Sequence, residues 1–178
     1  MAQGLVDRMR GAAALDVATY EEVENDLTAT GQAATVVAIG AVAAGIGASG
    51  HGIGGILVAV IASLLGWAFW AGVTFLVGTR LMDGTATWGE LLRTLGFAQA
   101  PRVLLVLGIV PVLGKLVVFL VGIWTLVTGI VAIRQALDVT TGKAVVVAIV
   151  SLLAVVVVTV LLGSVFGIGA ALTNMRPA

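Results

Sequence analysis

Few residues in this sequence could perform acid–base or metal chemistry, and they are gathered in its polar intervals. Glu21, Glu22, Glu24 and Asp26 form the densest acidic group, and carboxylates at this density can bind calcium weakly. A solvated acidic helix face explains the same pattern, and we favour it. His51 is the only histidine, so a catalytic triad has no evident base. We expect no catalytic residue, no cofactor and no metal site.

Two further kinds of chemistry are disfavoured by residue type. The glycine-rich stretch at residues 50–55 lacks the lysine and the strand-to-helix context of a phosphate-binding loop. Glycine accepts backbone angles that other residues resist, so we interpret this stretch as a turn. Cysteine is absent, which excludes disulfides, cysteine-ligated zinc, iron–sulfur clusters and a cysteine nucleophile.

Composition indicates that lipid, rather than water, surrounds most of the chain. Of the 178 residues 60% are hydrophobic and 10% are charged, whereas soluble domains carry about 25% charged residues. The mean hydropathy is +1.18. Nine basic and nine acidic residues balance, so no nucleic-acid partner is indicated. The first thirty residues are polar and lack the apolar core of a signal peptide, so we expect the first span to direct insertion.

The hydrophobic pattern therefore predicts an all-α polytopic membrane protein with a five-helix transmembrane bundle. A cytoplasmic amphipathic region at residues 1–30 precedes a transmembrane domain at 31–172, and a tail at 173–178 follows it. The expected spans cover residues 32–49, 53–77, 102–113, 115–133 and 144–168.

The number of spans depends on residues 103–133, which are apolar except around Pro111, Gly114 and Lys115. Two spans here place seven basic residues on the amino-terminal side and two on the other. A single span gives six and two and leaves Lys115 in the hydrocarbon, which costs about 3 kcal/mol on insertion scales. Because basic residues favour the cytoplasmic side, we predict five spans with a cytoplasmic amino terminus.

Two polar segments could meet on that side. Apolar residues recur every three or four positions over residues 5–27, which predicts an amphipathic helix with an acidic opposite face. It could lie on the membrane surface, fold against the spans or dock a partner. Arg93 and Arg102 could pair with the acidic residues 21–26, each exposed pair contributing about 0–1 kcal/mol.

The second polar segment, residues 78–101, carries a helix signal. Thr87 followed by Glu90 is a capping-box pattern, and Pro101 ends the apolar side that follows. We predict a short interfacial helix before the third span, with Trp88 at the interface. The candidate partner-contact residues of both segments are Tyr20, Glu21, Glu24, Arg80, Trp88, Glu90, Arg93, Pro101 and Arg102.

Small residues predict where helices pack closely, because they let backbones approach each other in lipid. Gly163 and Gly167 form a GxxxG pair that fits either bundle packing or homodimerisation. The candidate helix-packing residues are Gly40, Ala44, Gly45, Pro111, Gly163 and Gly167.

The order of several motifs resembles the Yip1 domain family. They are DVATYEEVENDLTATGQA at residues 16–33, GTR at 78–80, TWGELLRTLGFAQAPR at 87–102 and GIWTLVTGIVAIR at 122–134. The resemblance covers about residues 16–166, implies five spans, and is to the prokaryotic members with a short amino-terminal region. Eukaryotic members act in vesicle trafficking and bind Rab-type GTPases. A prokaryotic source makes Rab binding doubtful and implies a location in the cytoplasmic membrane.

In the five-span topology no titratable side chain lies within a span, apart from Lys115 at a turn. The hypothesis is therefore a non-enzymatic membrane scaffold of the Yip1 family, with the bilayer and other membrane proteins or itself as partners, and no small-molecule substrate. An accessory subunit of a larger respiratory or photosynthetic complex is the alternative. A channel or transporter is a second alternative, disfavoured because such proteins generally need intramembrane charge.

Overall fold

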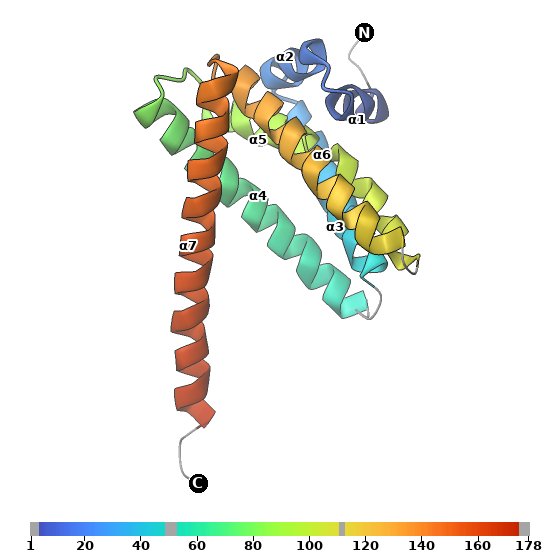
Figure 1. Ribbon diagram of the computed structural model, residues 1–178, viewed down its shortest axis with the longest axis vertical. Helices are drawn as coiled ribbons and strands as arrows, with labels where there is room; N and C mark the ends of the chain where they lie inside the picture. Colours follow the sequence, from blue (N-terminus) through green and yellow to red (C-terminus); the bar gives the residue numbers. More distant parts are fainter. Residues whose placement is uncertain (1–3, 49–52, 111–112, 175–178) are drawn as a thin grey trace.

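The structure, a computed structural model, describes residues 4–48, 53–110 and 113–174. These residues form seven α-helices and one 3-10 helix and contain no strand (Figure 1), which confirms the predicted all-α fold. His51 and Pro111 lie outside the described residues. The elements are α1 Leu5–Ala13, α2 Val17–Asn25, α3 Ala29–Gly47, α4 Ile53–Leu81, α5 Trp88–Phe97, the 3-10 helix η1 Ala100–Ile109, α6 Leu113–Ala136 and α7 Thr141–Asn174.

Five segments among the described residues are long and apolar enough to cross a membrane, which confirms the predicted polytopic architecture. The third of them differs from the predicted range of 102–113, because α5 and η1 join into one apolar segment. The short interfacial helix that we expected before the third span is α5, and it forms the first half of this third segment. The five segments are Ala29–Gly47, Ile53–Leu81, Trp88–Ile109, Leu113–Ala136 and Thr141–Leu161.

The polar segments gather at one end of the bundle. We call α1, α2, the residues 26–28 that follow α2, and the loops 82–87 and 137–140 the polar end (Figure 1). Thr85 joins the two loops, since its N–H donates to the carbonyl of Leu137 at 3.2 Å and its hydroxyl to Asp138 at 2.8 Å. The Lys143 ammonium donates to the carbonyl of Met82 at 2.9 Å. The two loops therefore lie on one side, as the two spans between them, Trp88–Ile109 and Leu113–Ala136, require.

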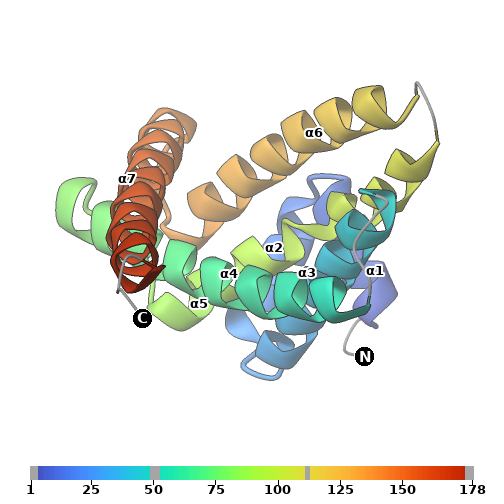
Figure 2. The same cartoon turned by 90° about the horizontal axis from the view of Figure 1, so that it is seen from below.

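Away from the polar end, α4 and α7 diverge, and the far half of α7 extends beyond the other helices (Figures 1 and 2). The described buried residues of α7 all lie in its first turns: they are Ala144, Val147, Ala148 and Ser151. The later residues Val156, Val157 and Val160 are exposed. In a bilayer these side chains contact lipid, which explains how a helix with a little-packed end is tolerated.

The amphipathic helix predicted over residues 5–27 is wrong as a single element, because the structure has two helices there. Asp16 caps α2: its carboxylate accepts from the Ala18 N–H at 3.3 Å and from the Thr19 hydroxyl at 2.7 Å. Leu15 adopts a left-handed backbone angle, φ 63°. Gly11 then lets α2 approach, since a Cβ there would lie 2.1 Å from the Thr19 hydroxyl. The cap thus reverses the chain and pairs the two helices.

The predicted capping box of α5 is confirmed. Thr87 accepts from the N–H of Glu90 at 3.3 Å, and the Glu90 carboxylate accepts from the N–H of Thr87 at 2.7 Å. The helix ends at Phe97, and Pro101 lies in the first turn of η1. A 3-10 helix of ten residues is unusually long. It packs along α3, where a Cβ on Gly47 would lie 2.0 Å from the carbonyl oxygen of Leu105.

Candidate functional site

The helix pair α1–α2 is fastened to the spans by buried hydrogen bonds. The Tyr20 hydroxyl donates to the carbonyl of Ala12 at 3.0 Å and lies 3.3 Å from that of Thr128 in α6. The indole N–H of Trp124 donates to the carbonyl of Ala13 at 2.8 Å. Arg93 in α5 donates its Nε to the carbonyls of Val23 and Glu24, each at 3.0 Å. The pair is therefore a fixed part of the bundle and presents one constant outer surface.

A buried arginine ties α1 to α2 and α3. Arg8 is 1% exposed. Its guanidinium donates to Glu22 at 2.8 Å, to Asp26 at 2.6 Å and to Gln32 at 3.1 Å. The hydrogen bond with Glu22 is the main cause of a raised pKa for Arg8. Hydrogen bonds from Thr28, followed by Arg8, lower the pKa of Asp26 to about 2. Arg8 and Asp26 therefore both remain charged at neutral pH.

This network corrects the expected ion pairs. Arg93 does contact residues 21–26, but through the carbonyls that end α2 rather than through a carboxylate. Cations stabilise that end of a helix, where carbonyls lack partners. Arg102 bonds to Gln99 instead and does not reach the acidic residues. The sequence prediction missed the ion pairs of Arg8, because in a single helix over residues 5–27 the Arg8 side chain could not reach Glu22.

Glu24 lies among other carboxyl groups at the polar end. Burial, followed by the charges of Glu90, Asp138 and Glu21, raises its pKa to about 7. The nearby charge of Arg93 acts in the opposite direction. No group of three or more metal-ligating side chains occurs among the described residues. The raised pKa of Glu24 therefore predicts that the stability of the polar end changes with pH near neutrality.

We predict that the Glu24→Gln variant unfolds at a higher temperature than the parent chain at pH 8. The folded-state pKa, about 7, lies above the reference value of 4.5. The contribution of Glu24 to the free energy of unfolding is therefore fully present below pH 4.5 and is lost as the pH rises through 7. Thermal unfolding in detergent between pH 5 and 8 measures it, with the exposed Asp7→Asn as control. Parallel pH profiles for Glu24→Gln and the parent would contradict the prediction.

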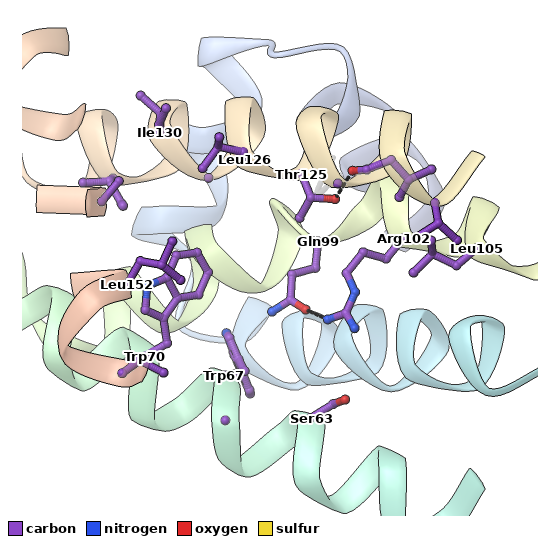
Figure 3. Close-up of a pocket in the computed structure, with 18 residues that line it drawn as sticks. Ser63, Trp67, Trp70, Gln99, Arg102, Leu105, Thr125, Leu126, Ile130 and Leu152 are labelled. Atoms are coloured by element: carbon purple, nitrogen blue, oxygen red, sulfur yellow. Dashed lines mark hydrogen bonds between the residues drawn. The ribbon is translucent and has the colours of Figure 1, made fainter. Parts of the chain in front are cut away.

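A second feature is a cavity of about 590 Å³ between α4, η1, α6 and α7 (Figure 3). Most of its wall is apolar, with Trp67 and Trp70 on α4 and Leu126 and Ile130 on α6 (Figure 3). Apolar lining residues on its rim are more than half exposed: Val118 52%, Leu126 54% and Leu152 52%. The cavity is therefore open sideways, between helices that would face lipid.

Arg102 projects into this cavity beside Gln99, to which it donates a hydrogen bond (Figure 3). Its Cβ faces Gly40, the twelfth of the nineteen residues of α3. Arg102 forms no salt bridge within the described part of the chain. The expectation that the bundle encloses no titratable group is therefore wrong at Arg102. The sequence prediction placed the start of the third span next to Pro101, whereas in the structure the apolar segment begins at Trp88. Arg102 therefore lies inside the segment rather than at its edge.

The candidate partner-contact residues divide by exposure. Tyr20, Arg93 and Pro101 are buried, so in this structure their side chains hold the bundle together and do not reach its surface. Glu24, Glu90 and Arg102 are half-buried, and Glu21, Arg80 and Trp88 are exposed. Trp88 lies against α4, with its indole N–H donating to the carbonyl of Ala68 at 3.3 Å. The exposed set therefore defines what a partner at the polar end could touch.

The candidate helix-packing residues have different surroundings. A Cβ on Gly40 would lie 3.1 Å from the Arg102 side chain, and one on Gly45 would lie 3.2 Å from Ile56. Ala44 is half-buried in α3. Gly163 and Gly167 belong to the last part of α7, where side-chain surroundings are not described, so their part in bundle packing or homodimerisation stays a prediction.

These observations define a polytopic α-helical membrane protein with a packed helix pair at its polar end. Residues 18–162 match the Yip1 domain, and the chain belongs to that family. The resemblance to this family found in the sequence is thereby confirmed, and the likeness to its prokaryotic members stays a prediction. The match begins in α2, so α1 and Arg8 precede it. Comparisons with curated proteins and with solved structures give no match.

Proposed function

We propose that this Yip1-family protein acts as a non-enzymatic membrane scaffold that binds another membrane protein, or a second copy of itself, through its polar end. The observation that carries the proposal is the fixed helix pair. Arg93 in α5 and Trp124 in α6 donate to its backbone carbonyls, and the Tyr20 hydroxyl of α2 donates to the carbonyl of Thr128 in α6, so two different spans hold it. A surface that is already ordered loses little conformational entropy on binding, which favours recognition.

The chemistry of that surface supports a protein partner. Leu27, just after α2, is 78% exposed, the Glu21 carboxylate on α2 is exposed, and Trp88, directly after the loop 82–87, is 50% exposed. Aromatic and aliphatic anchors with a polar rim are typical of protein interfaces. We place this end in the cytoplasm, because six of the nine basic residues lie on its side in the five-span topology when Arg102, inside the bundle, is left out. The acidic surface is poorly suited to anionic lipid headgroups.

Site-specific photo-crosslinking in intact membranes tests the proposal. A photoreactive residue replaces Leu27 at the polar end, or Phe119 in α6, which is 64% exposed on the span surface. We expect discrete protein adducts from position 27 and none from position 119. Equal adduct patterns from both positions would contradict the proposal. So would the absence of any protein adduct at 27 together with a monomeric state in mild detergent.

A further inference from the structure

Arg102 is a charged side chain in a mostly apolar cavity, and the described residues provide no carboxylate to neutralise it. Gln99 supplies one neutral hydrogen-bond acceptor. An arginine has five N–H donors, so several remain for a ligand. Removing a charge from water, even in part, is costly unless the charge is paired. The cavity is therefore complementary to an anionic group.

The rest of the cavity selects the other part of the ligand. Apart from Ser63, Gln99, Arg102 and Thr125, its wall consists of apolar side chains and glycines. The hydroxyl of Thr125 is occupied, because it donates to the carbonyl of Val121 at 2.8 Å. A volume of about 590 Å³ is in the range of sites that hold small organic ligands. An apolar chain attached to an anionic head fits both parts of this wall.

The position of Arg102 gives such a ligand a route of entry. Gly40, which faces Arg102, lies seven residues before the end of α3 at Gly47, or about 10 Å along the helix. The exposed rim residues Val118, Leu126 and Leu152 open the cavity toward the bilayer. A molecule already in the membrane can therefore enter sideways, without first crossing water.

From this geometry we propose that the cavity between α4, η1, α6 and α7 binds an acidic phospholipid, with its phosphate on Arg102 and an acyl chain along the α4 and α6 walls. The site is independent of the partner surface at the polar end. Arginine recognises phosphate through charge-assisted hydrogen bonds, often in pairs. A zwitterionic lipid with the same chains offers the same apolar contact but carries a compensating cation beside its phosphate.

Native mass spectrometry of the delipidated full chain tests the site. Phosphatidylglycerol and phosphatidylcholine with identical acyl chains are added in equal amounts. We expect the parent chain to retain one phosphatidylglycerol with about tenfold preference. Arg102→Gln removes the preference, whereas Arg80→Gln, which changes an exposed arginine, leaves it intact. Equal retention of both lipids by the parent, or an unchanged preference in Arg102→Gln, would overturn the proposal.

A second variant keeps the charge and fills the space. Gly122 lines the cavity, and a Cβ there would meet no atom within 4 Å. We expect Gly122→Leu to fold with an unfolding temperature no lower than that of the parent, because leucine favours a helix over glycine, and to lose phosphatidylglycerol affinity about tenfold. Retention of the lipid by this variant would place binding elsewhere and overturn the site. Displacement of phosphatidylglycerol by inorganic phosphate alone would overturn the proposed role of the acyl chain. Displacement of phosphatidylglycerol by oleate would overturn the phospholipid proposal and assign the site to fatty acids.

Discussion

The Arg8→Ala variant is expected to lose about 2–3 kcal/mol of unfolding free energy, because hydrogen bonds to charged groups contribute about 1.5–3 kcal/mol each. The guanidinium is the common donor to Glu22, Asp26 and Gln32. Its removal leaves two carboxylates close together without their cation. Solvent reaches both carboxylates in part, with side-chain exposures of 31% and 24%, which keeps the loss below that of a fully buried pair.

The effect should be confined to the helix pair at first. Hydrogen exchange of residues 5–25 in detergent should speed up strongly in Arg8→Ala, while α4 and α6 keep their protection. Arg8→Lys retains the charge but not the forked geometry, so an intermediate loss is expected. Arg10→Ala is the matched control, since Arg10 is exposed on the same helix. Equal stability and exchange in Arg8→Ala and Arg10→Ala would refute the assigned role of the network.

The five-span architecture could be predicted because two independent signals agreed. Hydrophobic length located the helices, and the distribution of basic residues required a turn near Lys115. The Thr87–Glu90 capping box was also readable, since its two hydrogen bonds depend on residues three positions apart. Local interactions of this kind are encoded in adjacent residues and need no knowledge of the tertiary structure.

The break between α1 and α2 was missed because apolar residues keep a helical period across Asp16. The Asp16 side chain, which could lie on the solvated face of one long helix, instead caps the start of α2. That choice is decided by tertiary contacts, including Tyr20 with Thr128, 108 positions apart. The partners of Arg8 follow from this reversal and were therefore out of reach of a periodicity argument.

The cavity was missed for a different reason. Pro101 ends an α-helix, and the prediction placed the start of a span there. The chain instead continues as η1 beside α3, which the glycines at 40 and 47 permit. Arg102 is thereby carried inside the bundle. The crossing of α4, α6 and α7 around it depends on helix packing, which the nearly uniform apolar composition of these helices does not specify.

The close contact between α3 and α5 gives the second large prediction: Gly96→Ala should destabilise the protein by about 1–3 kcal/mol through overpacking. A Cβ on Gly96 would lie 2.6 Å from the Cβ of Ala33 and 3.2 Å from its Cα and carbonyl oxygen. These atoms belong to the helix backbone or are attached to it directly, so no side-chain rotation relieves the clash. The loss should appear in spite of the roughly 1 kcal/mol that alanine gains over glycine inside a helix.

A matched control and a compensating change separate this clash from other effects of the substitution. Gly66→Ala in α4 adds a Cβ that meets no atom within 4 Å, so it should leave stability unchanged or slightly raised. Ala33→Gly removes the opposing methyl group, and the double variant Ala33→Gly/Gly96→Ala should be more stable than the sum of the two single changes implies. Denaturant unfolding in one detergent measures the parent chain and the four variants. Strict additivity of the two changes would show that the helices do not meet at this point.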